Sequence, residues 1–94
     1  MNDERVRAFL ADTLILWRVR GTVEAGVAPV VAVIRNDKGA TISVERSSPP
    51  FRWLVRAQRP RPCASLVGLL GALRAALGVE RGSALRIAPA QPEK

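Results

Sequence analysis

Apolar residues near the start of the chain follow the spacing of an amphipathic helix. They recur three and four positions apart between Val6 and Trp17, which places them on one side of a helix. Asn2 or Asp3 can act as the N-cap, since each carries a side-chain oxygen that accepts from the free N–H groups of a first turn. We therefore expect a helix that begins at this point.

A second pattern overlaps the end of this helix. Every other residue from Ile15 to Val23 is apolar or small, as in a half-buried strand. Residues 14–17 satisfy both periods, so helix and strand both stay open for them. We favour helix up to about Thr13 and strand afterwards.

The middle of the chain predicts a β-hairpin. Residues 36–39 read Asn-Asp-Lys-Gly, a turn sequence with glycine at the position that needs a left-handed backbone. This turn pairs Ile34 with Ile42 and Ala32 with Val44. Because both pairs are apolar on one face, the register and the hydrophobic pattern agree.

A further strand and a connector follow the hairpin. Residues 51–57 alternate between apolar and polar side chains, which predicts a strand. Residues 59–62 read Arg-Pro-Arg-Pro, and this proline spacing argues against regular structure. We expect an extended connector there.

A second helix is expected over residues 62–77, with Gly78 as its C-terminal stop. Its core stripe consists of Leu66, Leu69, Leu70, Leu73 and Leu77. Gly68 and Gly71 interrupt the helix with residues that lack a side chain, so we expect close packing against a sheet or another helix. Arg74 is the only charge, which predicts that this chain or a partner buries most of the helix.

These elements define the expected fold. Residues 84–88 predict a short last strand and residues 89–94 a disordered tail. The order is then α-β-β-β-β-α-β: an α+β fold with a mainly antiparallel sheet of four to five strands and helix packed on one face. We expect residues 1–88 to form a single domain.

Composition narrows the chemistry. The chain has no histidine and one cysteine, Cys63, so it offers no Ser-His or Cys-His pair and no His-ligated metal site. Its acids are scattered, and we expect no catalytic residue, no metal and no cofactor, hence no enzyme. Cys63 is interpreted as a small packing residue. A single thiol without a secretion signal favours a reducing, cytoplasmic location. The longest apolar run, residues 64–73, falls far below the roughly 20 residues that span a bilayer.

Charge is the most informative feature. The formal net charge is +7, and no acid occurs between Glu45 and Glu80. Strand alternation and the proline-rich connector predict a basic sheet face with these anion-binding or nucleic-acid-binding candidates: Arg18, Arg20, Arg52, Arg56, Arg59 and Arg61. A GC-rich genome also enriches arginine, so a solvated basic face remains the competing interpretation.

Val31 and Val33 fall on the second face of the predicted hairpin, opposite polar residues. Together with the nearly uncharged second helix they indicate more apolar surface than one small sheet covers. The sequence therefore predicts a non-enzymatic interaction module that self-associates as a homodimer or larger homo-oligomer. The alternative is a non-specific nucleic-acid-binding domain, and an acidic protein is a further possible partner.

Overall fold

The computed structural model describes residues 2–79 as one antiparallel sheet with two helices. In chain order the elements are α1 (Asp3–Leu16), β1 (Gly21–Glu24), β2 (Val30–Asn36), β3 (Thr41–Arg46), β4 (Trp53–Arg56), β5 (Pro60–Cys63) and α2 (Leu66–Leu77). The strands lie side by side in the order β1-β2-β3-β4-β5. The predicted last strand, residues 84–88, and the predicted tail, residues 89–94, lie outside the described residues.

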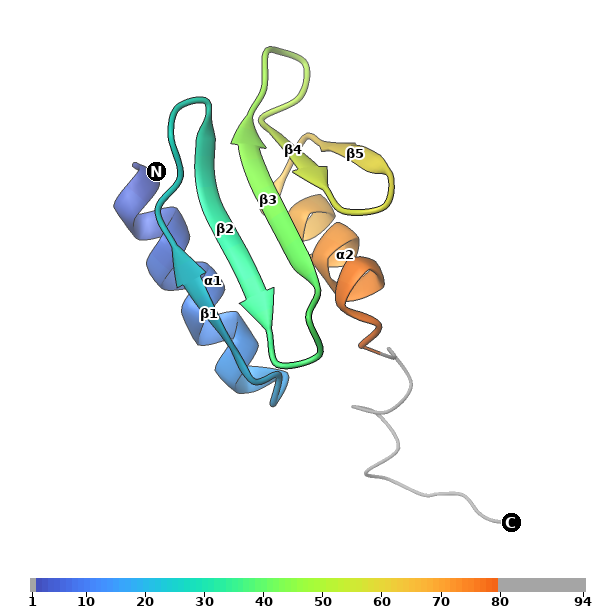
Figure 1. Ribbon diagram of the computed structural model, residues 1–94. Coiled ribbons are helices and arrows are strands. Elements are labelled where there is room, and N and C mark those ends of the chain that lie inside the picture. Colours follow the sequence, from blue (N-terminus) through green and yellow to red (C-terminus); the bar gives the residue numbers. More distant parts are fainter. Residues whose placement is uncertain (1, 80–94) are drawn as a thin grey trace, which may run out of the picture.

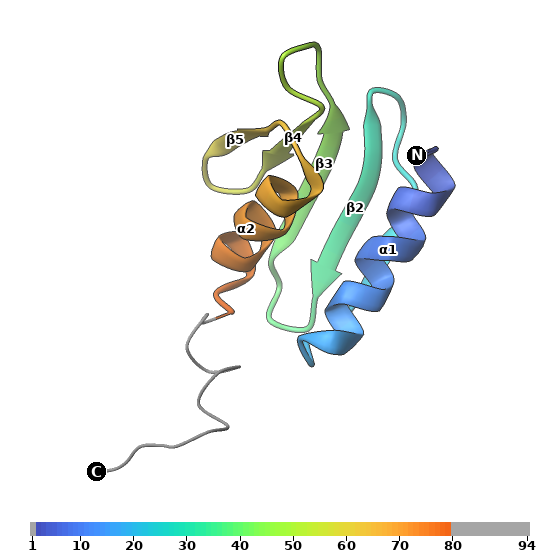
Figure 2. The ribbon, with the colours of Figure 1, turned by 180° about the vertical axis from the view of Figure 1, so that it is seen from behind.

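Both helices cover the same face of the sheet. Figure 1 shows the strands in front of α1 and α2, and the reverse view in Figure 2 shows both helices in front of the strands. α1 packs on β1 and β2, whereas α2 packs on β4 and β5. The predicted α+β class with helix on one face is confirmed. The predicted element order is corrected, because a fifth strand precedes α2.

α1 forms as its apolar spacing predicts. The Asn2 Oδ1 atom accepts a hydrogen bond from the Arg5 N–H at 2.8 Å and caps the first turn. Val6, Leu10 and Leu14 follow one another four residues apart, and all three are buried. They form the stripe that faces the sheet, so burial of this stripe holds the helix in place.

The residues with two possible conformations are helical. α1 continues to Leu16, and β1 begins only at Gly21, so the predicted strand start at Ile15 is wrong. The physical reason is Leu14, whose burial belongs to the helical stripe and outweighs the strand pattern. Ile15 and Leu16 remain 75% and 78% exposed, which shows that the alternating pattern gains no burial.

The β2–β3 hairpin has the predicted register. Ile34 lies opposite Ile42 and Ala32 lies opposite Val44, and all four side chains are buried under the helices. Gly39 in the connecting turn has φ +86°, a left-handed conformation that residues with a side chain rarely adopt. The turn chemistry and the hydrophobic pattern therefore select the same pairing.

One extra residue in β2 changes which side chains face the helices. The register shifts between Val30 and Ala32, so Val31 forms a β-bulge in which two residues oppose one. Val31 and Ala32 are both buried, and Arg7 of α1 donates from Nη1 to the Val31 carbonyl at 2.9 Å. The prediction that Val31 shares the open face with Val33 is therefore wrong for Val31. Val33 stays on the open face and is half-buried.

The Arg-Pro-Arg-Pro segment forms part of an edge strand, which corrects the predicted irregular connector. β5 pairs antiparallel with β4. Proline has no N–H to donate, but Pro60 and Pro62 are two positions apart, so their nitrogen atoms point to the same edge of the strand. Because β5 ends the sheet, that edge needs no partner strand.

α2 begins later than predicted because β5 occupies the residues before it. Its N-cap is Ser65, whose Oγ accepts from the Gly68 N–H at 3.1 Å. The predicted stop is confirmed, since Gly78 caps the helix with φ +73°. A glycine suits this position because it carries no Cβ that would clash in the left-handed region.

The two glycines inside α2 are not explained by packing on the sheet. Leu69 and Leu73 are buried toward the sheet, whereas Gly68 and Gly71 are exposed. A Cβ added to Gly71 would meet no atom within 4 Å among the described residues. The expected close packing therefore does not occur within residues 2–79 for Gly71.

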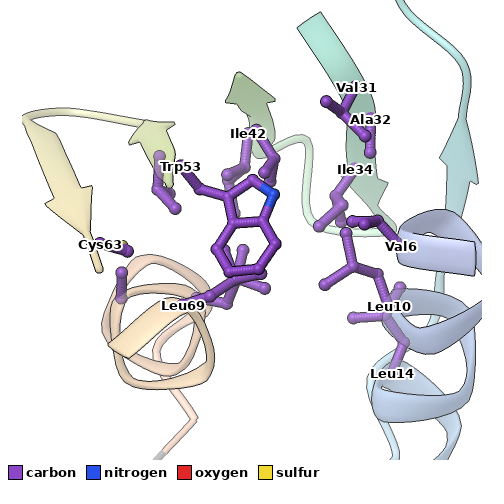
Figure 3. Packing of buried hydrophobic residues seen from close by; sticks show 14 residues of the cluster. Val6, Leu10, Leu14, Val31, Ala32, Ile34, Ile42, Trp53, Cys63 and Leu69 are labelled. Carbon is purple, nitrogen blue, oxygen red and sulfur yellow. The ribbon is translucent and has the colours of Figure 1, made fainter. Parts of the chain in front are cut away.

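Trp53 fills the space between the two helices. It is 1% exposed, and Figure 3 shows its indole ring between Leu69 of α2 and the α1 side chains Val6 and Leu10. It is the largest fully buried side chain of the described chain. Its Nε1–H has no hydrogen-bond partner among the described residues. The ring therefore contributes through packing and not through hydrogen bonding.

We expect Trp53→Ala to lower the free energy of unfolding by about 3–5 kcal/mol, because it leaves a cavity between α1 and α2. Trp53→Phe should cost clearly less, since a ring remains and the unpartnered N–H, whose burial costs about 1–3 kcal/mol, is removed. Urea denaturation followed by circular dichroism measures both. Trp17→Ala, at a half-buried ring, is the control with a smaller loss. Equal losses for Trp53→Phe and Trp53→Ala would contradict this role.

Candidate functional site

The structure separates the six arginines that the sequence groups together. Arg56 forms an ion pair with Glu45, with its Nε 2.6 Å from Oε2. Arg52 precedes β4, and its guanidinium carbon lies 4.8 Å from the centroid of the Trp53 ring. Neither side chain lines the grooves at which the other four arginines meet.

The open face of the sheet carries both signs of charge. Besides the Arg56–Glu45 pair, the Arg35 Nε lies 3.7 Å from the Glu24 Oε1. Exposed pairs of this kind stabilise a fold by at most about 1 kcal/mol. Each pair nevertheless places a carboxylate beside a guanidinium. Part of the positive charge that strand alternation predicts for this face is therefore compensated by carboxylates.

Five cationic side chains gather instead at one end of the molecule. Two adjoining grooves lie there, and both have the β2–β3 turn and the end of α2 in their walls. One groove, of about 510 Å³, contains Arg59 and Arg61, and the other, of about 530 Å³, contains Arg18 and Arg20. Lys38 lines both. We refer to these five residues and the grooves between them as the basic end.

The grooves lie where the ends of both helices come close to a hairpin turn. Figure 1 shows the end of α1, the β2–β3 turn and the end of α2 at the same end of the molecule. Arg18 and Arg20 lie in the connection between α1 and β1, so they do not alternate along a strand as predicted. Arg59 lies in the β4–β5 turn and Arg61 in β5.

Local hydrogen bonds hold the cations of the second groove together. The Asp37 N–H donates to the Arg20 carbonyl at 3.1 Å and ties the α1–β1 connection to the turn. Within the turn, the Asn36 Oδ1 atom accepts from the Lys38 N–H at 3.0 Å and from the Ala40 N–H at 2.8 Å. These contacts fix the backbone beneath Lys38 and leave its ammonium group exposed.

A ring contact connects α2 to the same region. The Arg74 guanidinium carbon lies 5.0 Å from the centroid of the Trp17 ring, within the range of a cation–π contact. Trp17 caps the end of α1 and lines the groove that contains Arg18. The contact therefore joins α2 to the end of α1.

The basic end keeps a positive charge after its neighbours are counted. Within residues 2–79 none of its five cations has a carboxylate at ion-pair distance. The ion-paired arginines lie elsewhere: Arg35, Arg46 and Arg56. Among the described residues Asp37 is the acid in the groove walls. The ends of α1 and α2 each add about half a negative charge, which leaves a net charge of about +3.

Lys38 is the residue of the basic end that sequence reasoning missed. The sequence assigns it only to the hairpin turn, where its charge has no direct bearing on the turn type. The available signal is its position at the tip of a hairpin, which keeps a cation in solvent. Its place between two groups of arginines follows only from the assembled sheet.

Cys63 belongs to the core. It is 4% exposed, and its Sγ donates to the Arg61 carbonyl at 3.4 Å. Burial raises the pKa of the thiol, and the positive charge of Arg61 lowers it less. At neutral pH the group is therefore a protonated packing side chain, which is the interpretation reached from the sequence.

A third groove follows the outer side of α2. It measures about 470 Å³ and is lined by Val67, Leu70, Gly71, Arg74, Ala75 and Val79. Val67 is 80% exposed, so an apolar side chain stands in solvent beside Gly71. Of the apolar surface predicted from the sequence, α2 exposes Val67, whereas Val31 is buried and Val33 is half-buried.

Comparisons with known proteins leave the function to be argued from this geometry. No family model matches the chain, and no curated protein or solved structure matches it. In the described part of the chain, no helix has the length and apolar character needed to cross a membrane. Nor do three metal-ligating side chains meet within residues 2–79.

We expect the native Cys63 thiol to react slowly with a thiol reagent near neutral pH and completely in urea. Burial raises its pKa above the ordinary 9.0, so the folded state holds the thiol proton more tightly than the unfolded state. The resulting stability is complete below about pH 9 and falls as the pH rises further, a loss that Cys63→Ser should lack. Rapid reaction of the folded protein at neutral pH would contradict this environment.

Proposed function

We propose that this chain is a non-enzymatic binding module that holds nucleic acid at its basic end without sequence preference. One observation carries the proposal. Five cations surround two adjoining grooves, whereas ion-paired arginines lie elsewhere on the described chain. A site of this kind attracts an anion and keeps its charge available for it.

A nucleic acid backbone fits this arrangement better than a single small anion does. A guanidinium group bonds two phosphate oxygens at once, and nucleic acid presents phosphates at regular intervals. Adjoining grooves with arginines on both sides of Lys38 suit such a series of charges. An acidic protein carries carboxylates without this regular spacing, and it is the competing partner that the experiment below distinguishes.

The grooves offer few side chains that could recognise nucleic acid bases. Trp17 is the aromatic residue in their walls, and Arg74 already stacks over its ring. Stacking on exposed rings supplies much of the affinity of single-strand-binding proteins. Without free rings, binding should depend on phosphate contacts and be similar for all sequences.

We expect Arg59→Gln with Arg61→Gln to weaken binding to duplex DNA and to flatten its salt dependence. Each phosphate contact changes the slope of log K against log salt by about −0.9, so five contacts predict a slope of roughly −4 to −5. Loss of two contacts should flatten it by about two units. Fluorescence anisotropy between about 50 and 200 mM salt measures both.

The matched control is Arg35→Gln with Arg56→Gln, which removes the same charge from the open sheet face. It should change the slope much less than the groove variant does. Equal effects of the two variants would show that net charge alone drives binding. Absence of DNA binding by the unmodified protein at low salt would refute the function and favour an acidic protein as partner.

Self-association is the second candidate function, and the outer side of α2 favours it. Gly71 lies within the helix, where glycine costs about 1 kcal/mol relative to alanine. No atom among the described residues comes within 4 Å of a Cβ placed there, so packing within the described chain does not require glycine. Close approach of a second α2, beside the exposed Val67, would explain both residues.

Gly71→Ala tests this candidate in two ways. It should raise the stability of the isolated chain by about 0.5–1 kcal/mol, because the added methyl group meets free space. It should also weaken association, because the methyl group would keep two helices apart. Sedimentation over a roughly hundredfold concentration range, together with urea denaturation at low concentration, measures the two effects. A monomer throughout that range would contradict self-association.

A further inference from the structure

The end of α1 forms a hydrogen-bonded cap that needs a left-handed residue. The Arg18 N–H donates to the Ile15 carbonyl at 3.0 Å, and the Val19 N–H donates to the Leu14 carbonyl at 2.9 Å. This pair of bonds closes a helix only when the residue after the C-cap turns into the left-handed region. Arg18 occupies that position with φ +59°.

α2 ends in the same motif with a glycine. The Gly78 N–H donates to the Ala75 carbonyl at 3.3 Å, and the Val79 N–H donates to the Arg74 carbonyl at 3.0 Å. Gly78 has φ +73°, in the same region as Arg18. The chain therefore uses the usual residue at one helix end and an arginine at the other, and both residues line the same groove.

The arginine is the less stable choice at this position. The Cβ of a residue in the left-handed region crowds the neighbouring carbonyl oxygen, a contact that glycine avoids. Strained residues of this kind concentrate at active sites and ligand-binding sites, where the strained backbone positions the side chain for its function. The backbone of Arg18 thus suggests a function for its side chain.

Contacts within the described chain do not explain the arginine. Its side chain is exposed, and among residues 2–79 it forms no hydrogen bond or ion pair. Its charge does lie near the C-terminal end of α1, which favours a cation. That attraction needs only a positive charge in the last turn and no left-handed arginine, so it is the alternative to be tested.

We propose that Arg18 anchors a phosphate subsite of the basic end. The subsite is the groove of about 530 Å³ between the end of α1 and the β2–β3 turn, where Arg20 and Lys38 also lie. Its ligand is a phosphodiester group of a nucleic acid backbone. The planar guanidinium group of Arg18 donates hydrogen bonds to two phosphate oxygens, and Arg20 and Lys38 add positive charge. The inference rests on the proposed function and assigns one of its phosphate contacts.

Replacement of Arg18 separates binding from stability. Arg18→Gly removes the guanidinium group and relieves the backbone strain. Glycine also increases the conformational freedom of the unfolded chain, which offsets part of the gain in stability. The Tm should therefore be unchanged or higher by up to about 5 °C. Affinity for duplex DNA should fall about fivefold to tenfold near 0.1 M salt, and the salt slope should flatten by about 0.9.

Three further variants make the test specific to the arginine side chain. Arg18→Asn, the other substitution that tolerates a left-handed backbone, should lose affinity like Arg18→Gly. Arg18→Lys keeps the charge and should keep the slope while losing part of the affinity, because an ammonium group lacks the fork. Arg35→Gln, on the open face, is the control and should change affinity by less than about twofold.

Two results would overturn the subsite. Unchanged affinity in Arg18→Gly and Arg18→Asn, with a lower Tm in both, would assign Arg18 to the helix end. Loss of affinity in Arg18→Gly alone would assign the effect to the backbone. In either case, weaker binding by the Arg59→Gln, Arg61→Gln protein would leave the proposed function standing. Failure of the unmodified protein to bind DNA would remove both.

Discussion

Burial of one sheet face under both helices is the constraint on which the rest of the structure depends. The buried apolar side chains of β2, β3 and β4 point to this face, where α1 packs on β1 and β2 and α2 packs on β4 and β5. Trp53 fills the space between them. The Arg35–Glu24 and Arg56–Glu45 ion pairs lie on the opposite, open face.

The number of strands then decides where the helices end. Each strand of the meander runs opposite to the one before it, and five strands separate α1 from α2. Because that number is odd, the two helices run in the same direction, as Figures 1 and 2 show. Four strands would turn α2 around and carry its C-terminal end away from that of α1. β5, the short strand with two prolines, is therefore what brings the two helix ends together.

The basic end is a consequence of this topology. Two helix ends and a hairpin turn come together there, and each contributes residues that lie outside helices and strands. Helix C-termini carry a partial negative charge, so cations are favoured beside them on stability grounds alone. Five cations exceed what two helix ends require, and the left-handed Arg18 adds backbone strain to that excess. Excess charge and backbone strain at one place are the observations that support the proposed binding of an anionic ligand.

The sequence by itself determined whatever depends on neighbours a few residues apart. The apolar stripe of α1, the left-handed Gly39 and Gly78, and the pairing of Ile34 with Ile42 all follow from local spacing and turn chemistry. Because the chain has no histidine, it offers no Ser-His or Cys-His pair and no His-ligated metal site, whatever its fold.

Only the tertiary structure decided the features that join distant segments. Proline is compatible with β5 only because that strand lies at the edge of the sheet, and no local pattern announces an edge. Val31 reaches the core through a bulge that Arg7, from another element, helps to satisfy. Arg56 is ion-paired because Glu45 lies on the neighbouring strand β3, whereas no described acid comes within ion-pair distance of Arg18. Spacing along a chain predicts which way a side chain points as long as the element stays regular, whereas its partners are set by contacts that form only when the sheet and both helices have assembled.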